Sequence, residues 1–353
     1  MHVNTARGWR GGERQILWLT ERLNAMGVTS LVATRPNEPL GAELRARGLP
    51  LVPFEPLGEW DVRAIAKLRR HAGKAGINIL NAHDGHANTI AALATRRTQK
   101  LVITRRVHQP ITRNFVSRWK YIRAAGVIAI SNLVARIVEE AGVPRERIHV
   151  VHSGVPLDRR VEPASRETLA ALAVPPGAPL VVMVGALVGH KDPLNFVRAI
   201  RVAREAVPDL KALLVGRGSM RPVIESEISR LGLEQTLLLT GHRTDADALM
   251  AAASVAVLSS REEGLGTVVL DAMQLSIPVV ATATSAIVDV IRDGVDGLLA
   301  PVGDSAALGH RIVEVLSRDS TPLVERARRR VAEFSADATA AKTLAVYQHI
   351  LRA

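Results

Sequence analysis

Two carboxylates bracket a glycine turn in the second half of the sequence. Glu263 comes directly before Gly264-Leu265-Gly266, and Asp271 lies about one turn into a helix that the pattern predicts from Thr267. A helix start presents free N–H groups and the positive end of its dipole, which suits a phosphate, and Thr267 is expected to cap this one. The two acids can accept hydrogen bonds from hydroxyls on either side of a diphosphate. The pattern favours a sugar nucleotide, with a tight turn beside two solvated acids as the alternative.

The segments that must position this turn read as strand, loop and helix. Residues 254–258 form a short apolar run that predicts a strand ending at a polar loop. Similar runs alternate with helical patterns along the chain, at 1–5, 30–33, 51–53, 77–82, 101–104, 127–130, 148–151, 180–184, 213–216 and 237–240. Such alternation predicts parallel sheets covered by helices, whose ligands lie beyond the carboxyl ends of the strands. The first run is short, which allows a natural start upstream of Met1.

A chain of 353 residues exceeds the usual size of a single core, which predicts two domains. Prolines recur between 155 and 179, helix signals lapse there, and a new strand begins at Leu180. We therefore predict an N-terminal domain over 1–158, a linker over 159–179, a C-terminal domain over 180–330 and a final helical segment over 331–353. A monomer that opens and closes about the linker is expected.

Composition limits the kinds of binding partner and the cellular compartment that we expect for this protein. The net charge of +12 favours anionic partners without selecting nucleotide, lipid headgroup or nucleic acid. The absence of cysteine excludes disulfides and thiolate chemistry. No apolar run approaches the roughly 18 residues of a membrane span, and no signal-peptide pattern is present. We expect a soluble cytoplasmic protein, with a peripheral position at the inner face of the membrane as a further hypothesis.

That hypothesis comes from the segment Arg113–Arg123, which interleaves basic residues with Phe115, Trp119 and Tyr121 in a chain that is 3% aromatic. As a helix it would have one apolar and one basic face, able to rest on an anionic membrane or bind a phosphorylated acceptor. Packing of its aromatic side chains in the core is the alternative.

Two strand ends carry further polar candidates. Arg105 and Arg106 follow one predicted strand and are candidate phosphate ligands, with a basic surface loop as the alternative. His83 and His86 follow another, but they lack further Cys or His neighbours and the H-E-x-x-H spacing, so no metal site is predicted. The acidic pair within 245–247 falls at an expected helix start and is not taken as a metal pair either.

The second half resembles a known family. Glu263-Gly264-Leu265-Gly266, Leu270-Asp271-Ala272-Met273 and residues 277–282 are similar to the E-G-F-G, L-E-A-M and P-V-V-A-T motifs of retaining family 4 glycosyltransferases with the GT-B fold. Asp293-Gly294 and Gly297-Leu298-Leu299 resemble the D-G-x-x-G-L-L motif that follows. The resemblance implies an α/β fold of two Rossmann-like parallel-sheet domains facing across a cleft, with the C-terminal helix crossing back to the first domain. It implies transfer of a sugar, with retention of configuration, from a UDP-, GDP- or ADP-sugar to a surface glycan or glycolipid intermediate.

The resemblance also implies roles for individual residues, with the acceptor bound by the N-terminal domain. The catalytic candidates are Glu263, His108 and Lys191. The candidates for the donor diphosphate are Gly11, Gly12, Lys191, Gly264, Leu265, Gly266, Thr267, Arg105 and Arg106. On the nucleoside side the candidates are Asp271, Gly216, His242 and Arg243. No cofactor or metal is expected, because these groups would meet the charge of the diphosphate.

The sequence departs from the family pattern at two positions. Asp271 stands where the family has a glutamate, so a shorter carboxylate would have to reach the ribose. Ala186 stands where the family has an arginine, so one phosphate contact is missing or comes from Arg105, Arg106 or His190.

Three other functions could use parts of the same pattern. A hydrolase is rejected because Glu263 and Asp271 would lie about 12 Å apart if the segment is helical, too far for either glycosidase geometry. A nucleotide-sugar epimerase on the same fold remains open. So does a non-catalytic basic binder of anionic lipid or nucleic acid with a decayed donor site, although no nucleic-acid motif is present.

Overall fold

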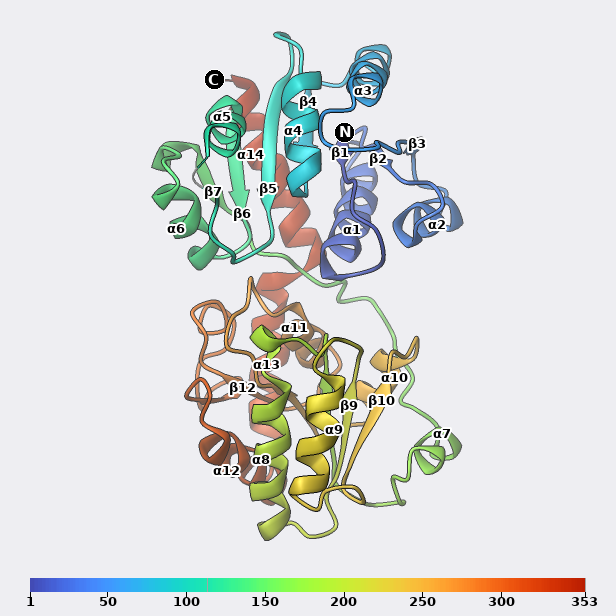
Figure 1. Cartoon of the computed structure of the whole chain (residues 1–353), viewed down its shortest axis with the longest axis vertical. Helices are drawn as coiled ribbons and strands as arrows, with labels where there is room; N and C mark the ends of the chain where they lie inside the picture. Colours follow the sequence, from blue (N-terminus) through green and yellow to red (C-terminus); the bar gives the residue numbers. More distant parts are fainter. Residues whose placement is uncertain (113, 353) are drawn as a thin grey trace. The chain divides into compact units, whose positions relative to one another are not determined.

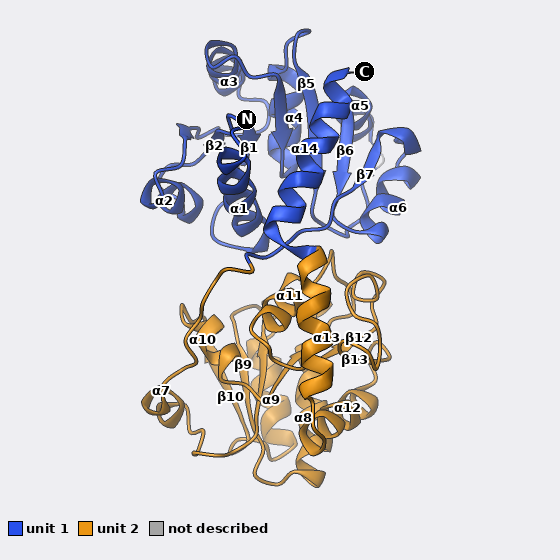
Figure 2. Cartoon of the chain, turned by 180° about the vertical axis from the view of Figure 1, so that it is seen from behind, with its two compact units in different colours: residues 1–156, 334–353 blue, residues 157–333 orange. Residues whose placement is uncertain are grey.

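The computed structural model describes residues 1–112 and 114–352 and divides the chain into two compact units (Figures 1 and 2). Unit 1 comprises Met1–Pro156 together with Phe334–Ala353, and unit 2 comprises Leu157–Glu333. Arg113, the first residue of the predicted basic-aromatic segment, lies outside the described residues. None of the described helices is long and apolar enough to cross a membrane.

Unit 1 is built on a seven-stranded sheet in the order β3-β2-β1-β4-β5-β6-β7, with every pair parallel. Its strands are β1 (His2–Val3), β2 (Val32–Thr34), β3 (Leu51–Pro53), β4 (Ile79–Ala82), β5 (Lys100–Arg105), β6 (Gly126–Ala129) and β7 (Ile148–Val150). The chain order reverses at β1, which lies between β2 and β4. Ligands of such sheets bind at the crevice that this reversal creates beyond the carboxyl ends.

Helices cover both faces of this sheet: α1 (Gly11–Ala25), α2 (Pro39–Ala46), α3 (Val62–Lys74), α4 (Gly85–Ala94), α5 (Phe115–Arg123), α6 (Asn132–Glu140) and α14 (Ala336–Arg352). The last of these packs against α1 (Figure 2). Tyr347 and Ile350 of α14 are buried in one core cluster with Leu19 of α1 and Val102 of β5. The C-terminal segment is therefore an integral part of unit 1.

Unit 2 has a six-stranded parallel sheet in the order β10-β9-β8-β11-β12-β13. The strands are β8 (Leu180–Val184), β9 (Lys211–Val215), β10 (Leu237–Gly241), β11 (Val255–Leu258), β12 (Val279–Thr282) and β13 (Leu298–Ala300). The helices are α7 (Arg166–Ala171), α8 (Pro193–Ala206), α9 (Arg221–Arg230), α10 (Ala246–Ala251), α11 (Thr267–Gln274), α12 (Ser305–Ser317) and α13 (Thr321–Val331). The order reverses at β8, which lies between β9 and β11.

Local chemistry explains two differences from the predicted elements. α7 lies inside the segment predicted as a helix-free linker, because the Ser165 hydroxyl caps it by accepting a hydrogen bond from the Thr168 N–H at 3.1 Å. The sequence pattern predicts a helix from about Glu13 to Met26, whereas α1 begins at Gly11. The Glu13 carboxylate accepts a hydrogen bond from the Arg10 N–H at 2.9 Å and so closes the first turn.

Candidate functional site

The reversal point of unit 2 brings together the loops that follow β8 and β11. Lys191 lies in the first loop and Glu263 in the second, and Lys191 Nζ is 2.6 Å from Glu263 Oε1. The Ser260 hydroxyl donates to the same oxygen, also at 2.6 Å. Glu263 is only 5% exposed. A buried carboxylate needs such partners, since an unpaired one would carry a desolvation cost of several kcal/mol.

The two loops are fastened to each other by further hydrogen bonds. The Ser259 hydroxyl donates to the carbonyl oxygens of Asp192 at 2.8 Å and Lys191 at 3.1 Å. The Arg261 N–H donates to the His190 carbonyl at 2.8 Å, and the Arg261 guanidinium pairs with the Asp192 carboxylate at 2.7 Å. These bonds hold the Lys191 and Glu263 side chains in register before any ligand binds.

The backbone conformation and close packing at position 266 require a glycine. This residue has φ +75°, and a Cβ there would lie 2.4 Å from the Ile287 Cδ1 atom. Gly266 is itself the N-cap of α11 and supplies no side-chain hydrogen bond. The expectation that Thr267 caps the helix was therefore wrong: Thr267 is the first helical residue. Its contribution to a phosphate site can still come from its backbone N–H.

Asp271 contacts an arginine that the sequence pattern did not predict as its partner. Its carboxylate is buried and accepts a hydrogen bond from Arg159 Nη2 at 3.1 Å, while Arg159 Nη1 pairs with Asp247 at 2.6 Å. Arg159 falls in the segment predicted as a linker, where no motif marks one arginine among several.

The other nucleoside-side candidates follow the neighbouring strands β9 and β10. A Cβ at Gly216 would lie 1.8 Å from the Gly185 carbonyl oxygen, so this glycine permits close packing of the loop after β8. The Arg243 guanidinium makes two hydrogen bonds of 2.7 Å to Asp245, which lower the pKa of that carboxyl, and His242 is exposed.

Unit 1 brings three of the predicted phosphate ligands together at its own reversal point. Gly11 and Gly12 form the first turn of α1, and a Cβ at Gly12 would lie 3.8 Å from Arg106 Cδ. Arg106 donates to the Ser153 hydroxyl at 3.0 Å, and burial lowers the pKa of its guanidinium to about 10. Burial also raises the pKa of Glu13, next to Gly12, and Glu13 in turn raises that of Arg106.

Arg105 does not join Arg106. It donates to the Tyr121 hydroxyl at 3.0 Å and to the Gln109 carbonyl, toward α5. His108 lies in the same loop, with its Nε2 3.4 Å from the Gln109 side-chain nitrogen. In α5 the aromatic side chains differ: Tyr121 packs in the core at 3% exposure, whereas Phe115 is 84% exposed.

The two histidines after β4 face different surroundings. His83 Nε2 lies 2.9 Å from His2 Nδ1 in a buried ring pair, whereas His86 is exposed on α4. Burial, the His2 ring and Arg106 hold the pKa of His83 well below its usual value. Within the described ranges, no group of three or more His, Cys, Asp or Glu side chains is placed to hold a metal ion.

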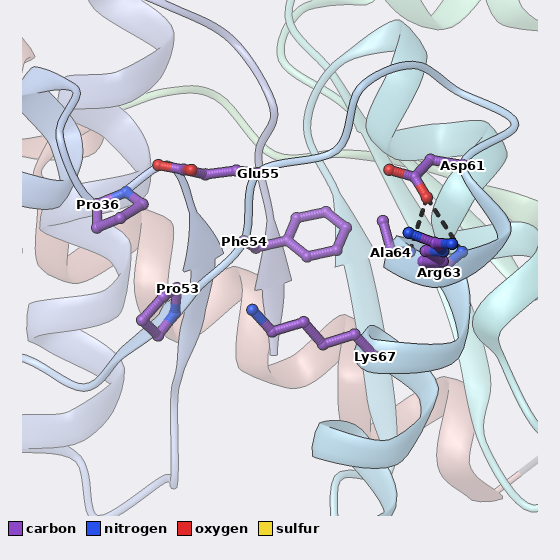
Figure 3. A pocket seen from close by; sticks show the side chains of 8 residues that line it. All are labelled: Pro36, Pro53, Phe54, Glu55, Asp61, Arg63, Ala64 and Lys67. Carbon is purple, nitrogen blue, oxygen red and sulfur yellow. Dashed lines mark hydrogen bonds between the residues drawn. The ribbon is translucent and has the colours of Figure 1, made fainter.

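A pocket of about 350 Å³ opens beside the carboxyl end of β3 in unit 1. It is lined by Pro36, Pro53, Phe54, Glu55, Asp61, Arg63, Ala64 and Lys67. Figure 3 shows the Phe54 ring at its centre, with the Lys67 amine extending toward it from α3. Asp61 is occupied in capping α3 through the N–H groups of Arg63 and Ala64, so the side chains of Glu55, Arg63 and Lys67 are the charged groups left to meet a ligand.

Family models match both units. The model described as glycosyl transferases group 1 matches residues 165–334, and that described as glycosyltransferase family 4 matches residues 9–159. The chain belongs to the group 1 glycosyltransferases. Among curated relatives of this glycosyltransferase, the 2-deoxystreptamine glucosyltransferase of Streptomyces kanamyceticus is 30% identical over 255 residues, which is 70% of this chain and 66% of that protein. The lipopolysaccharide core biosynthesis glycosyltransferase LpsE of Rhizobium meliloti is 30% identical over 64% of this chain.

The chain spans just under two thirds of the length of these two relatives, 66% and 65%. Solved structures match almost throughout. HepE of Anabaena in complex with UDP has a TM-score of 0.83 at 20% identity, with 99% of each chain covered. Sucrose-phosphate synthase of Thermosynechococcus elongatus has a TM-score of 0.77 at 21% identity, again over 99% of each chain. Together with the two parallel sheets, these likenesses confirm the predicted GT-B fold of this glycosyltransferase.

Proposed function

We propose that this protein transfers a sugar from a nucleotide diphosphosugar to a glycan or glycolipid acceptor, with retention of configuration and without a metal ion. The observation that carries the proposal is the Lys191–Glu263 pair at the reversal point of unit 2, beside the turn that Gly266 permits. Support for a uridine nucleotide comes from HepE, whose structures contain UDP and UDP-glucose.

The donor would bind with its diphosphate over the first turn of α11. As the bond between the sugar C1 and the diphosphate breaks, negative charge grows on the leaving oxygen, and the Lys191 ammonium and the helix N–H groups are fixed donors for that charge. Both hydrogen bonds to Glu263 in unit 2 fall on Oε1, so Oε2 is the oxygen offered to a hydroxyl of the sugar.

Retention follows if the acceptor attacks from the face that the diphosphate leaves. The acceptor oxygen forms the new bond to C1, and its proton passes to the departing diphosphate oxygen. No carboxylate has to act as a nucleophile in this scheme. In unit 1, Gly11, Gly12, Arg106 and His108 are proposed as ligands of a diphosphate.

The acceptor is proposed to bind unit 1, with the pocket beside β3 as its site. The volume of about 350 Å³ is at the lower end of the roughly 300–1,000 Å³ of small-molecule pockets. The exposed ring of Pro53 suits sugar C–H groups, and Glu55, Arg63 and Lys67 can bind hydroxyls. A peripheral position on the inner face of the membrane is proposed through α5, where Phe115 and Ile122 are exposed near Arg118.

The test is a transfer assay with UDP-, GDP- and ADP-sugars, with and without EDTA, on the wild type, Glu263→Gln and the neighbouring control Glu262→Gln. We expect release of nucleoside diphosphate and a glycosylated product that EDTA does not suppress. Glu263→Gln should lose activity by at least about a hundredfold while Glu262→Gln retains it. Conversion of the donor to an epimeric sugar nucleotide without acceptor would favour an epimerase instead.

A further inference from the structure

Arg159 fastens the segment that follows residue 156 to two helices of unit 2. Its guanidinium contacts Asp247, which follows the start of α10, at 2.6 Å and Asp271 on α11 at 3.1 Å. Its carbonyl oxygen accepts a hydrogen bond from the Gln274 side chain at 2.7 Å. The residue is thus held at both its backbone and its side chain.

The two carboxylates differ in their surroundings. The side chain of Asp271 is 4% exposed and that of Asp247 is 37% exposed, while Arg159 itself is 21% exposed. A buried carboxylate pays a desolvation cost, so Asp271 depends on the guanidinium far more than Asp247 does. One cation between two acids leaves a net charge of −1, so the cluster can still accept hydrogen bonds from hydroxyl groups.

The position of Asp271 on α11 relates this cluster to the proposed donor site. Asp271 is five residues beyond the N-cap Gly266, which is about 7.5 Å along the helix axis. A diphosphate on the first turn of α11 would therefore have its ribose near Asp271. The aspartate side chain is short, and the Arg159 guanidinium contacts it directly and so helps to fix its direction.

We propose that Arg159 is a positioning residue of the donor site, which holds the Asp271 carboxylate in place to accept a hydrogen bond from a ribose hydroxyl. This role rests on the proposed function, because it assumes a nucleoside diphosphate over α11. It differs from a purely structural ion pair in one respect: removing Arg159 should weaken recognition of the ribose hydroxyls in particular.

The experiment is calorimetric titration of the full chain with UDP and with 2′,3′-dideoxy-UDP. The variants are Arg159→Gln, Asp271→Asn and the double variant, with Asp247→Asn as the matched control that breaks the other contact of the same guanidinium. We expect the wild type to prefer UDP over the dideoxy analogue by about tenfold, and Arg159→Gln and Asp271→Asn each to reduce this preference to about twofold or less. The double variant should be no worse than either single one, because both act on one contact.

Asp247→Asn should keep the preference of the wild type, and Arg159→Lys, which retains the charge, should recover part of it. Thermal unfolding of each variant separates loss of the fold from loss of binding. Arg159→Gln with an unchanged preference, or with tighter binding of UDP, would overturn the proposal; the second result would mean that Arg159 competes with the ribose for Asp271. A folded wild type that binds neither UDP, GDP nor ADP would overturn the proposed function and this role together.

Discussion

Lys191 Nζ and Glu263 Oε1 lie 2.6 Å apart although 72 residues separate them in the chain. The pair spans two loops that meet only because β8 and β11 are neighbours in the sheet. Without a donor, each side chain is the main charged partner of the other. A diphosphate that binds Lys191 therefore also changes the surroundings of Glu263, so phosphate binding and sugar binding are coupled through one contact.

Replacing Lys191 with methionine should separate the contribution of this pair to stability from its contribution to nucleotide binding. The variant leaves the buried Glu263 carboxylate without its cation, and we expect a loss of about 1–3 kcal/mol in the free energy of unfolding. The double variant Lys191→Met/Glu263→Gln should recover part of that stability in urea denaturation but none of the nucleotide affinity. Undiminished binding of UDP by Lys191→Met would show that the diphosphate lies elsewhere.

Alanine at Gly266 should damage both the fold and the site. A Cβ would meet Ile287 and force a positive φ on alanine, at a cost of about 1–3 kcal/mol. Gly189→Ala is the stability control, since a Cβ there meets nothing within 4 Å. If both variants unfold at the same temperature, the close contact with Ile287 is not rigid.

The pocket beside β3 can be tested with two lysines on one helix. Lys67 lines the pocket from α3, whereas Lys74 is exposed at the far end of the same helix. We expect Lys67→Ala to raise KM for the acceptor about tenfold without changing KM for the donor, and Lys74→Ala to change neither. Equal effects of the two substitutions would point to general electrostatics rather than a binding pocket.

Stability should fall as the solution becomes acidic, because His83 is buried in its neutral form. Burial, the His2 ring and Arg106 lower its pKa in the folded state, so below about pH 6.5 the unfolded chain binds the proton that the folded chain resists. The stabilising contribution is present above that pH and is lost as the pH falls, by up to about 1.4 kcal/mol per unit. Between pH 7 and 5, the melting temperature of His83→Gln should change less with pH than that of the wild type. His86→Gln should show the same pH dependence as the wild type.

Peripheral membrane binding through α5 predicts a dependence on exposed apolar side chains. Phe115→Ser/Ile122→Ser should reduce co-sedimentation with vesicles of anionic phospholipid several-fold, and added salt should reduce it further. Val223→Ser, at an exposed apolar position of α9, is the control. Wild-type protein that stays in the supernatant would contradict the proposed membrane binding. It would not bear on the proposed sugar transfer.

The sheets were predictable because parallel strands buried on both faces read as continuous apolar runs. The predicted and observed bounds of β8 and β3 coincide, and the other strands predicted by residue range differ by a few residues at their ends; no range was predicted for β12 or β13. The turn at Gly266 was predictable for a related reason, since glycine between a strand and a helix marks positive φ. The cap was wrong because that same φ places Gly266, not Thr267, at the N-cap.

Contacts between side chains that are far apart in the sequence could not be predicted from local sequence patterns. Nothing in the proline-containing stretch around Arg159 distinguishes it from Arg160, and only the fold shows that its guanidinium reaches Asp247 and Asp271. Arg105 and Arg106 were grouped as one basic pair, yet consecutive residues at a strand end point to opposite sides. One therefore turns to Tyr121 and the other to Ser153.

Because α14 belongs to unit 1, the two units cannot complete their folding in the order in which their synthesis begins. Residues 157–333 are contiguous, so every strand of that sheet has been synthesised before α14 emerges. The N-terminal unit is made first, but the cluster around Leu19 and Val102 stays uncovered until Tyr347 and Ile350 arrive. The unit whose synthesis begins first is thus completed last, and it carries an exposed apolar face while the whole of unit 2 is synthesised.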